Sequence, residues 1–256
     1  MKQKSIILAI STLLTLGTAS ANATMIIFDG NNGGVKAGGT TSTANSANIG
    51  NPDRWGPVLQ FSDFDVSGGR SAGDNLNSGT FSRQSINSYN VDQDLSPQHG
   101  GLGVCSESQN CSGDSDSFQS NVGGNFQSDE VMFFDFHSAV SLQTIWFNGD
   151  HSEKVDGSTQ IPLKDSRNAL FNIFFSTDGD SYTNLFGDQV QPTDLEFIST
   201  GLTDSYQYFA VAASGYGSHM SYVEAISYKK VPEPSTLALL GLGLAGLGLI
   251  RRRVTS

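Results

Sequence analysis

The sequence has few of the residues that mark common kinds of catalytic or metal site. Its 256 residues include two cysteines, four scattered histidines and 14 lysines and arginines. Two cysteines cannot provide a soft zinc site without nearby histidines, and no histidine pair has metal-ligand spacing. The H-E-x-x-H and G-x-S-x-G signatures of zinc peptidases and serine hydrolases are absent. No sequence signature of catalysis therefore stands out, and we expect a protein that is not an enzyme.

Basic residues are especially scarce between the two ends of the chain. Residues 24–232 hold nine lysines and arginines against twenty-four aspartates and glutamates, a net charge of −15. Such a surface repels nucleic acids and anionic glycans. It is compatible with neutral sugars, with cations, or simply with solubility outside the cell. We expect no nucleic-acid partner.

The N-terminal residues have the order of a secretory signal peptide. A short basic stretch precedes an apolar run at residues 6–16, and Ala21 and Ala23 form a small-x-small cleavage site. The apolar run is too short to remain as a membrane span. We predict a signal peptide with a short helix at residues 1–23, cleavage after Ala23, and export by the Sec machinery.

The C-terminal end combines three features that follow one another directly. These are the motif Pro232-Glu233-Pro234, an uncharged apolar run, and the basic residues Arg251, Arg252 and Arg253. The run from Leu237 to Ile250 measures about 21 Å as a helix, against a hydrocarbon core of about 30 Å. We predict a short transmembrane helix over residues 236–250. The arginines after it place the C-terminus in the cytoplasm and the rest of the chain outside.

These three parts resemble the PEP-CTERM sorting signal of exopolysaccharide-producing bacteria, which here covers residues 231–256. The resemblance implies recognition by an exosortase, a membrane protease-transpeptidase that cuts near the Pro-Glu-Pro motif. Two prolines keep that segment extended and remove two backbone donors, which leaves it accessible. We therefore expect a transient inner-membrane anchor, followed by release to the cell surface or beyond.

The two cysteines, Cys105 and Cys111, lie six residues apart in a polar stretch of the exported region. In an oxidising compartment this spacing favours a short-loop disulfide. The loop is small, so we expect a modest stabilisation.

Short apolar segments separated by Gly, Ser, Asn and Asp predict an all-β domain over residues 24–230, with a loop-rich stretch at 24–57. The strand candidates are 25–28, 59–66, 131–136, 140–147, 169–175, 182–186, 206–212 and 220–228, and residues 68–94 are expected to be polar and rich in loops. The regular spacing and the lack of amphipathic helices favour a β-sandwich with long Gly/Ser/Asn-rich loops. Trp146 is expected in the core.

An Asp178-Gly179 pair between two aromatic-rich segments predicts a β-hairpin. The run from Phe171 to Leu185 and the segments after it also resemble the discoidin-type, galactose-binding-like jelly roll. That resemblance implies a jelly-roll-like sandwich that often carries one structural Ca²⁺.

Paired aspartates are the best candidates for such a cation, because Ca²⁺ prefers clustered oxygen ligands. Asp114 with Asp116, and Asp178 with Asp180, are the pairs we select, although they are also typical of solvated turns. Trp55 lies in a loop-like stretch and is a candidate for stacking on a sugar ring; the alternative is a loop residue packed on the sheet edge.

The sequence therefore leads to three hypotheses about function. The first is a non-enzymatic exported protein of the cell surface or matrix, associated with exopolysaccharide or biofilm. The second is a carbohydrate-binding module on a galactose-binding-like fold. The third is a secreted glycan-active enzyme with two acidic catalytic residues.

Overall fold

Strands make up most of the chain that the structure, a computed structural model, describes. The described residues are 23–28, 40–41, 54–71, 76, 79–94, 101–105, 118–119, 130–148, 170–193, 197–214 and 220–231. Within these ranges there is no α-helix, and the predicted all-β class is confirmed. The helices predicted at residues 1–23 and 236–250 lie outside the described residues, except for Ala23, which begins β1. No helix in the described ranges is long and apolar enough to cross a membrane.

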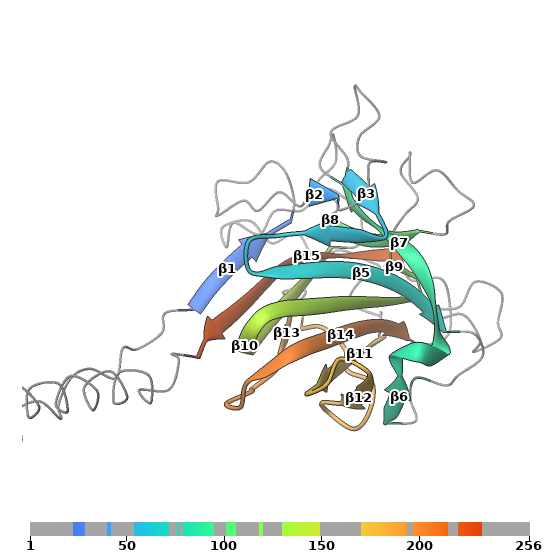
Figure 1. Cartoon of the computed structure of the whole chain (residues 1–256). Coiled ribbons are helices and arrows are strands. Elements are labelled where there is room, and N and C mark those ends of the chain that lie inside the picture. Colours follow the sequence, from blue (N-terminus) through green and yellow to red (C-terminus); the bar gives the residue numbers. More distant parts are fainter. Residues whose placement is uncertain are drawn as a thin grey trace, which may run out of the picture. The chain divides into compact units, whose positions relative to one another are not determined.

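The elements are short except for a few strands in the middle of the sheet (Figure 1). In chain order they are β1 (Ala23–Ile27), β2 (Thr40–Thr41), β3 (Arg54–Gly56), β4 (Val58–Gln60), β5 (Phe64–Ser71), β6 (Thr80–Ser82), the 3-10 helix η3 (Arg83–Ser85), β7 (Ile86–Asp94), β8 (Gly101–Cys105), β9 (Phe118–Gln119), β10 (Glu130–Asn148), β11 (Leu170–Ser176), β12 (Ser181–Asn184), β13 (Phe197–Ser199), β14 (Tyr206–Ser214) and β15 (Met220–Lys230).

The described strands form one antiparallel hydrogen-bonded network. Its main order is β2-β4-β5-β7-β8-β15-β10-β14-β11-β12-β6, and β5 pairs in addition with β10. Strands β5, β7, β8, β15 and β10 therefore form a closed circuit of pairings. Short strands extend this circuit: β1 and β9 pair with β15, β3 with β7, and β13 with β10.

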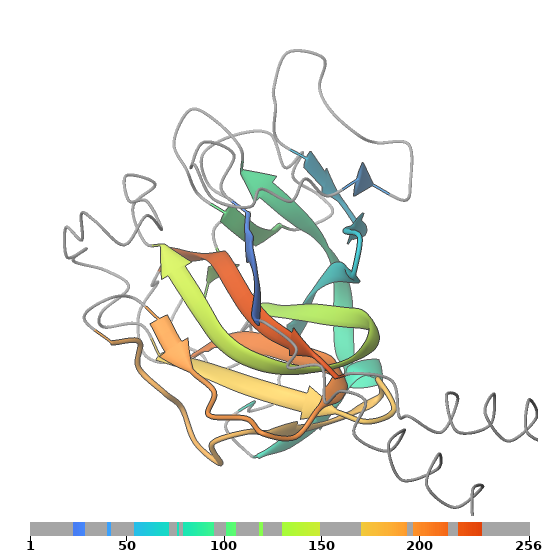
Figure 2. The same ribbon diagram turned by 90° about the vertical axis from the view of Figure 1, so that its left-hand side faces the viewer.

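Strand β10 connects the two parts of the network because it changes partners along its length. On one edge it pairs with β5 over residues 130–136 and with β15 over residues 140–148. Its register with β14 shifts between Asp135 and Val140, and the residues between them include three consecutive exposed positions, 137–139. Figure 2 shows the resulting curvature of this strand. The two strands predicted at 131–136 and 140–147 are thus one bent strand.

The core has two parts because the sheet around β10 is buried on both faces. Met132, Phe134 and Phe136 belong to the main cluster, together with side chains from β5, β8, β11, β14 and β15. Val131 and Phe133 point to the other face and pack in a second cluster with residues of β6, β7, β11, β12 and β14. A strand that is buried on both faces has a continuous apolar run instead of an alternating one, as residues 131–134 do. Trp146 is half-buried beside Phe197 and lies outside both clusters.

The expectation of loops at residues 68–94 was wrong. This stretch contains the end of β5, then β6, η3 and β7. The sequence pattern failed here because Gly68 and Gly69 occupy strand positions at which neighbouring atoms leave no room for a side chain. A Cβ on Gly68 would lie 2.7 Å from the Asn90 carbonyl oxygen, and one on Gly69 would lie 2.4 Å from Ile86 Cγ2.

The predicted hairpin at Asp178-Gly179 is confirmed, since β11 and β12 pair antiparallel on either side of it. Gly179 has φ +80°, a conformation that glycine adopts without steric cost. Asp178 Oδ1 accepts hydrogen bonds from the backbone N–H groups of Asp180 and Ser181, and Ser176 Oγ donates to the same oxygen at 2.9 Å. These bonds lower the pKa of Asp178, the one from Ser181 most. Asp178 therefore has a structural role in this turn.

Residues Ala23–Lys230 form one compact unit, and the predicted 24–230 domain lies within it. The two ends of this unit are neighbours, because β1 pairs with β15 and Ala23 is opposite Lys229. The predicted cleavage site after Ala23 and the Pro-Glu-Pro motif after Lys230 thus flank adjacent strand ends.

Candidate functional site

A group of polar side chains lies on one face of β5 and β10, beside the second hydrophobic cluster. Asp65 of β5 is directly opposite Asp135 of β10, and Ser67 is opposite Phe133. Alternate residues of a strand share a face, so Asp65 and Ser67 point to the same side as Asp135. On the far edge of β5, Ser67 pairs with Val58 of β4, whereas Gly68 pairs with β7. The sheet therefore forks beside Ser67.

Arg83 of η3 crosses this face and joins the two strands. Its Nη1 donates to both carboxylate oxygens of Asp135, at 2.9 and 3.0 Å, and its Nη2 donates to Ser67 Oγ at 2.8 Å. The guanidinium carbon lies 4.3 Å from the centroid of the Phe133 ring, a cation–π arrangement. The backbone N–H of Arg83 donates to the Asp180 carbonyl, which fixes η3 against the hairpin. Arg83 is thus held from three sides.

The two carboxylates beside Arg83 differ in their surroundings. Burial raises the pKa of Asp135; the charge of Arg83 lowers it in part, and the charge of Asp65 adds to the increase. Among the residues that the structure describes, Asp65 faces the imidazole of His137, whose Nε2 is 3.6 Å from Asp65 Oδ1. That distance is longer than a hydrogen bond. Asp65 is therefore an acceptor whose hydrogen-bonding capacity is largely unused.

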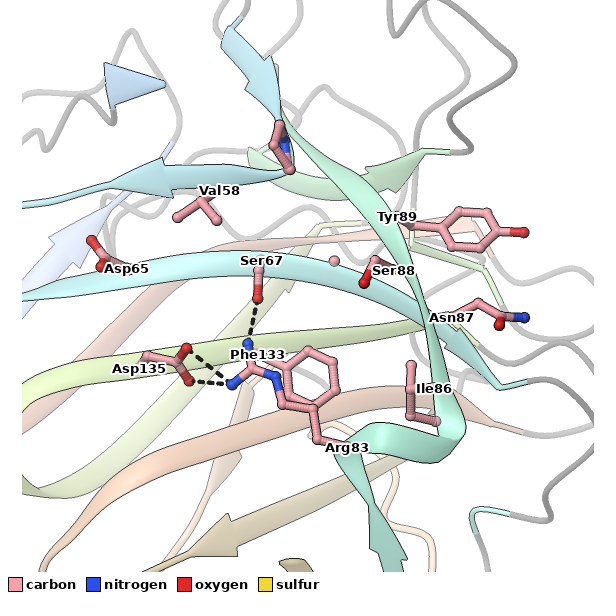
Figure 3. A pocket seen from close by; sticks show the side chains of 12 residues that line it. Val58, Asp65, Ser67, Arg83, Ile86, Asn87, Ser88, Tyr89, Phe133 and Asp135 are labelled. Carbon is pink, nitrogen blue, oxygen red and sulfur yellow. Dashed lines mark hydrogen bonds and ion pairs between the residues drawn. The ribbon is translucent and has the colours of Figure 1, made fainter. Parts of the chain in front are cut away.

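A cavity of about 320 Å³ opens at this fork. Figure 3 shows Arg83 between Asp135 and Ile86 with Ser67 bonded to its guanidinium, while Asn87 and Tyr89 point away from Arg83. Its full lining is Pro57, Val58, Asp65, Ser67, Gly68, Arg83, Ile86, Asn87, Ser88, Tyr89, Phe133 and Asp135. The cavity combines hydrogen-bonding groups with apolar side chains, which is the usual composition of a small-molecule site.

A second polar cluster lies at the end of β15. Asp63 accepts a hydrogen bond from Tyr228 Oη at 2.6 Å and one from Lys230 Nζ at 2.8 Å. Burial raises the pKa of Asp63, but the bonds from Lys230 and Tyr228 outweigh it, so the pKa lies below its ordinary value. Burial, with the bond to Asp63, raises the pKa of Tyr228. These bonds hold the last strand of the domain up to its final residue.

We expect Asp63→Asn to destabilise the fold by about 1 kcal/mol at pH 7, because it removes the charge that Lys230 and Tyr228 bind. Folding lowers the pKa of Asp63, so the charged side chain stabilises the fold. This stabilisation is complete above the ordinary pKa of 3.8 and is lost as the pH falls through the lower pKa of the folded state. The measurement is the free energy of unfolding of both proteins from pH 7 to pH 2. A difference that is the same at both extremes would contradict this prediction.

Of the predicted site residues, the structure describes Ala23 at the start of β1, Trp55, Cys105, and Asp178 with Asp180 in the hairpin turn. Asp178 belongs to the hairpin turn, and the residues that the structure describes contain no group of three or more acidic, histidine or cysteine side chains placed for a metal ion. Trp55 lies in β3, where its backbone pairs with Asp92, and Cys105 ends β8. The other predicted site residues lie outside the described residues: Cys111, Asp114, Asp116, Ala21, Pro232, Glu233, Pro234, Arg251, Arg252 and Arg253.

Sequence reasoning missed Arg83 as a site residue. Asp65 forms an Asp-x-Asp pair with Asp63 in the sequence, yet the two carboxylates have different partners in the structure. One signal was available: Asp135 interrupts an apolar run at 131–136, and a charge in such a position needs a partner. Which cation supplies it could not be deduced, because Arg83 is 52 residues away in sequence.

Comparison with known families finds the PEP-CTERM protein-sorting motif at residues 230–253. No curated protein and no solved structure matches the chain. The matched motif implies an exported protein with a C-terminal membrane anchor that an exosortase then processes. The match begins at Lys230, the last residue of β15.

Proposed function

We propose that the protein is a non-catalytic component of the cell surface or extracellular matrix that associates with exopolysaccharide. It is exported by the Sec machinery, held in the inner membrane with its C-terminus in the cytoplasm, and released by exosortase. The observation that carries this proposal is the sorting motif at residues 230–253, placed directly after an acidic β-domain. A net charge of −15 between the two ends favours neutral polymers over anionic ones.

The domain is, in this proposal, a jelly-roll-like β-sandwich of the galactose-binding type. What supports it is the antiparallel pairing of the central strands and the hairpin with its Ser-Thr-Asp-Gly turn. A Cys105–Cys111 disulfide and a structural Ca²⁺ at Asp114 and Asp116 belong to the same proposal.

The geometry of the carboxylates supports a role without catalysis. A glycosidase needs one carboxyl group that carries a proton and gives it to the leaving oxygen. Asp135 accepts from Arg83 on both of its oxygens, at 2.9 and 3.0 Å. The pair with Arg83 opposes the increase in the pKa of Asp135 that burial causes, and it engages both carboxylate oxygens in a structural contact.

Fractionation of the native host with and without its exosortase tests the sorting part. We expect a shortened protein in the surface or extracellular fraction of the parent strain. Without exosortase, a protein that retains its tail should remain in the membrane fraction. Replacement of Pro232, Glu233 and Pro234 by alanine should reproduce that result in the parent strain. Arrival outside the cell at unchanged mass in both strains would contradict the proposal.

The association with exopolysaccharide has its own measurement. The processed protein should sediment with polysaccharide isolated from the same host and should be released when that polymer is enzymatically degraded. Sedimentation that degradation does not alter would indicate aggregation instead.

A further inference from the structure

The cavity beside Arg83 has a rigid wall on which the polar groups are fixed before any ligand arrives. Arg83 is held by Asp135, by Ser67 and by the face of Phe133. A pre-organised wall reduces the entropic cost of binding. The cavity opens where the partner of β5 on that edge changes, because β5 pairs with β4 up to Ser67 and with β7 from Gly68 onward.

Two groups of this wall can still form hydrogen bonds with a ligand. Asp65 faces the imidazole of His137 at 3.6 Å, which leaves its oxygens available. Ser88 is exposed, and it lies on the same side of β7 as Ile86, facing Arg83 (Figure 3). Val58 and Ile86 add apolar surface next to these polar groups. A ligand that fits this wall has hydroxyl groups on one side and C–H groups on another.

The charges of the wall exclude several classes of ligand. Two carboxylates, Asp65 and Asp135, surround one guanidinium, so an anion would meet net negative charge. A divalent cation would meet Arg83, which already occupies both oxygens of Asp135. The volume of about 320 Å³ lies at the lower end of the range for small-molecule sites, which limits the ligand to a short segment of a chain.

We propose that this cavity binds a neutral sugar unit, with Asp65 as the main hydrogen-bond acceptor for its hydroxyl groups and Val58 and Ile86 against its C–H face. The proposal rests on the proposed association with exopolysaccharide and assigns it to one site. Arg83 and Ser67 position the wall, and the carboxylate of Asp65 provides two acceptor oxygens for neighbouring hydroxyls.

Asp65→Asn tests this assignment because its expected effects on folding and binding are opposite. Like charges directly opposite each other in a sheet are destabilising. Removal of the charge of Asp65 should therefore leave the fold intact or make it more stable. Binding should become about tenfold weaker, as expected for the loss of a charged hydrogen-bond acceptor. Asp204→Asn removes the same charge at an exposed position that does not line the cavity, and should change neither property.

The measurement is isothermal titration of the processed protein with neutral gluco-, galacto- and manno-oligosaccharides and with an oligosaccharide of uronic acids. We expect binding of at least one neutral oligosaccharide, no binding of the uronic acids, and about tenfold weaker binding by Asp65→Asn. A second variant, Val58→Trp, should fill the cavity and abolish binding while the melting temperature changes little.

The outcomes separate this proposal from the broader one. If the protein binds its host polysaccharide and neither Asp65→Asn nor Val58→Trp changes that binding, the assignment to the cavity is overturned and the broader proposal stands. If it binds no polysaccharide, both fail. Hydrolysis of a neutral oligosaccharide that Asp65→Asn abolishes would overturn the binding role in favour of a glycan-active enzyme.

Discussion

Gly101→Ala is expected to destabilise the domain by about 3–5 kcal/mol, a large part of the stability of a typical domain. Gly101 has φ +104°, which L-residues rarely adopt. A Cβ at this position would also lie 2.6 Å from the Val223 carbonyl oxygen and 3.0 Å from the Glu224 Cα. Both neighbours are backbone atoms of β15, so no side-chain rotation can relieve the clash. Denaturant unfolding of the processed protein measures the loss.

Two other glycines separate the causes of this effect. Gly79 and Gly187 have φ +89° and +72°, and a Cβ at either one would have no atom within 4 Å. Alanine there should cost only the backbone strain, about 1–2 kcal/mol. The additional loss of stability in Gly101→Ala then measures the effect of the close approach of β8 to β15. This approach closes the circuit of strands. An equal loss at all three positions would show that this approach contributes nothing.

Arg83→Leu is expected to cost about 2–3 kcal/mol at pH 7, since it leaves a partly buried Asp135 without its counter-charge. Leucine retains apolar contact with Phe133, so the loss of stability results mainly from removing the charge of Arg83. The carboxylates of Asp135 and Asp65 would then repel each other without the positive charge of Arg83 beside Asp135. Thermal and denaturant unfolding of the processed protein are the measurements.

The pH dependence of this variant provides its test. Without Arg83 the folded pKa of Asp135, already raised by burial, should rise further. Folding then favours the protonated form, so the destabilisation is present above the folded pKa and is relieved as the pH falls through it. Adding Asp135→Asn should restore most of the stability at pH 7. A loss independent of pH, and not restored by Asp135→Asn, would mean that Arg83 acts through packing alone.

Several strands could be predicted because their residues carry the necessary information locally. The segments 206–212 and 220–228 correspond to β14 and β15, and the Asp178-Gly179 turn specifies its hairpin through its own hydrogen bonds. The strands within 68–94 could not be predicted in this way. Gly68 and Gly69 have low strand propensity, and they lie in β5 because β7 and β10 approach too closely for any side chain.

The candidate site shows the same division. Pattern reasoning selected aspartates close together in sequence, but the cavity is formed by residues of β4, β5, β7, β10 and η3, which span 57 to 135. Asp65 and Asp135 become neighbours only through the register of β5 with β10. Long-range pairing has no local sequence signature, so the site could not be predicted.

The sequence by itself indicated export and exosortase processing, because a sorting motif is a contiguous segment that can be recognised without the fold; it lies at residues 230–253. It also determined the all-β class, through the spacing of its apolar segments. Only the tertiary structure decided that β10 bends between β5 and β15, that the end of the domain lies beside its beginning, and that Arg83 joins Asp135 to Ser67. The physical reason is that these features depend on contacts between residues tens of positions apart, whose energies exist only after the chain has folded.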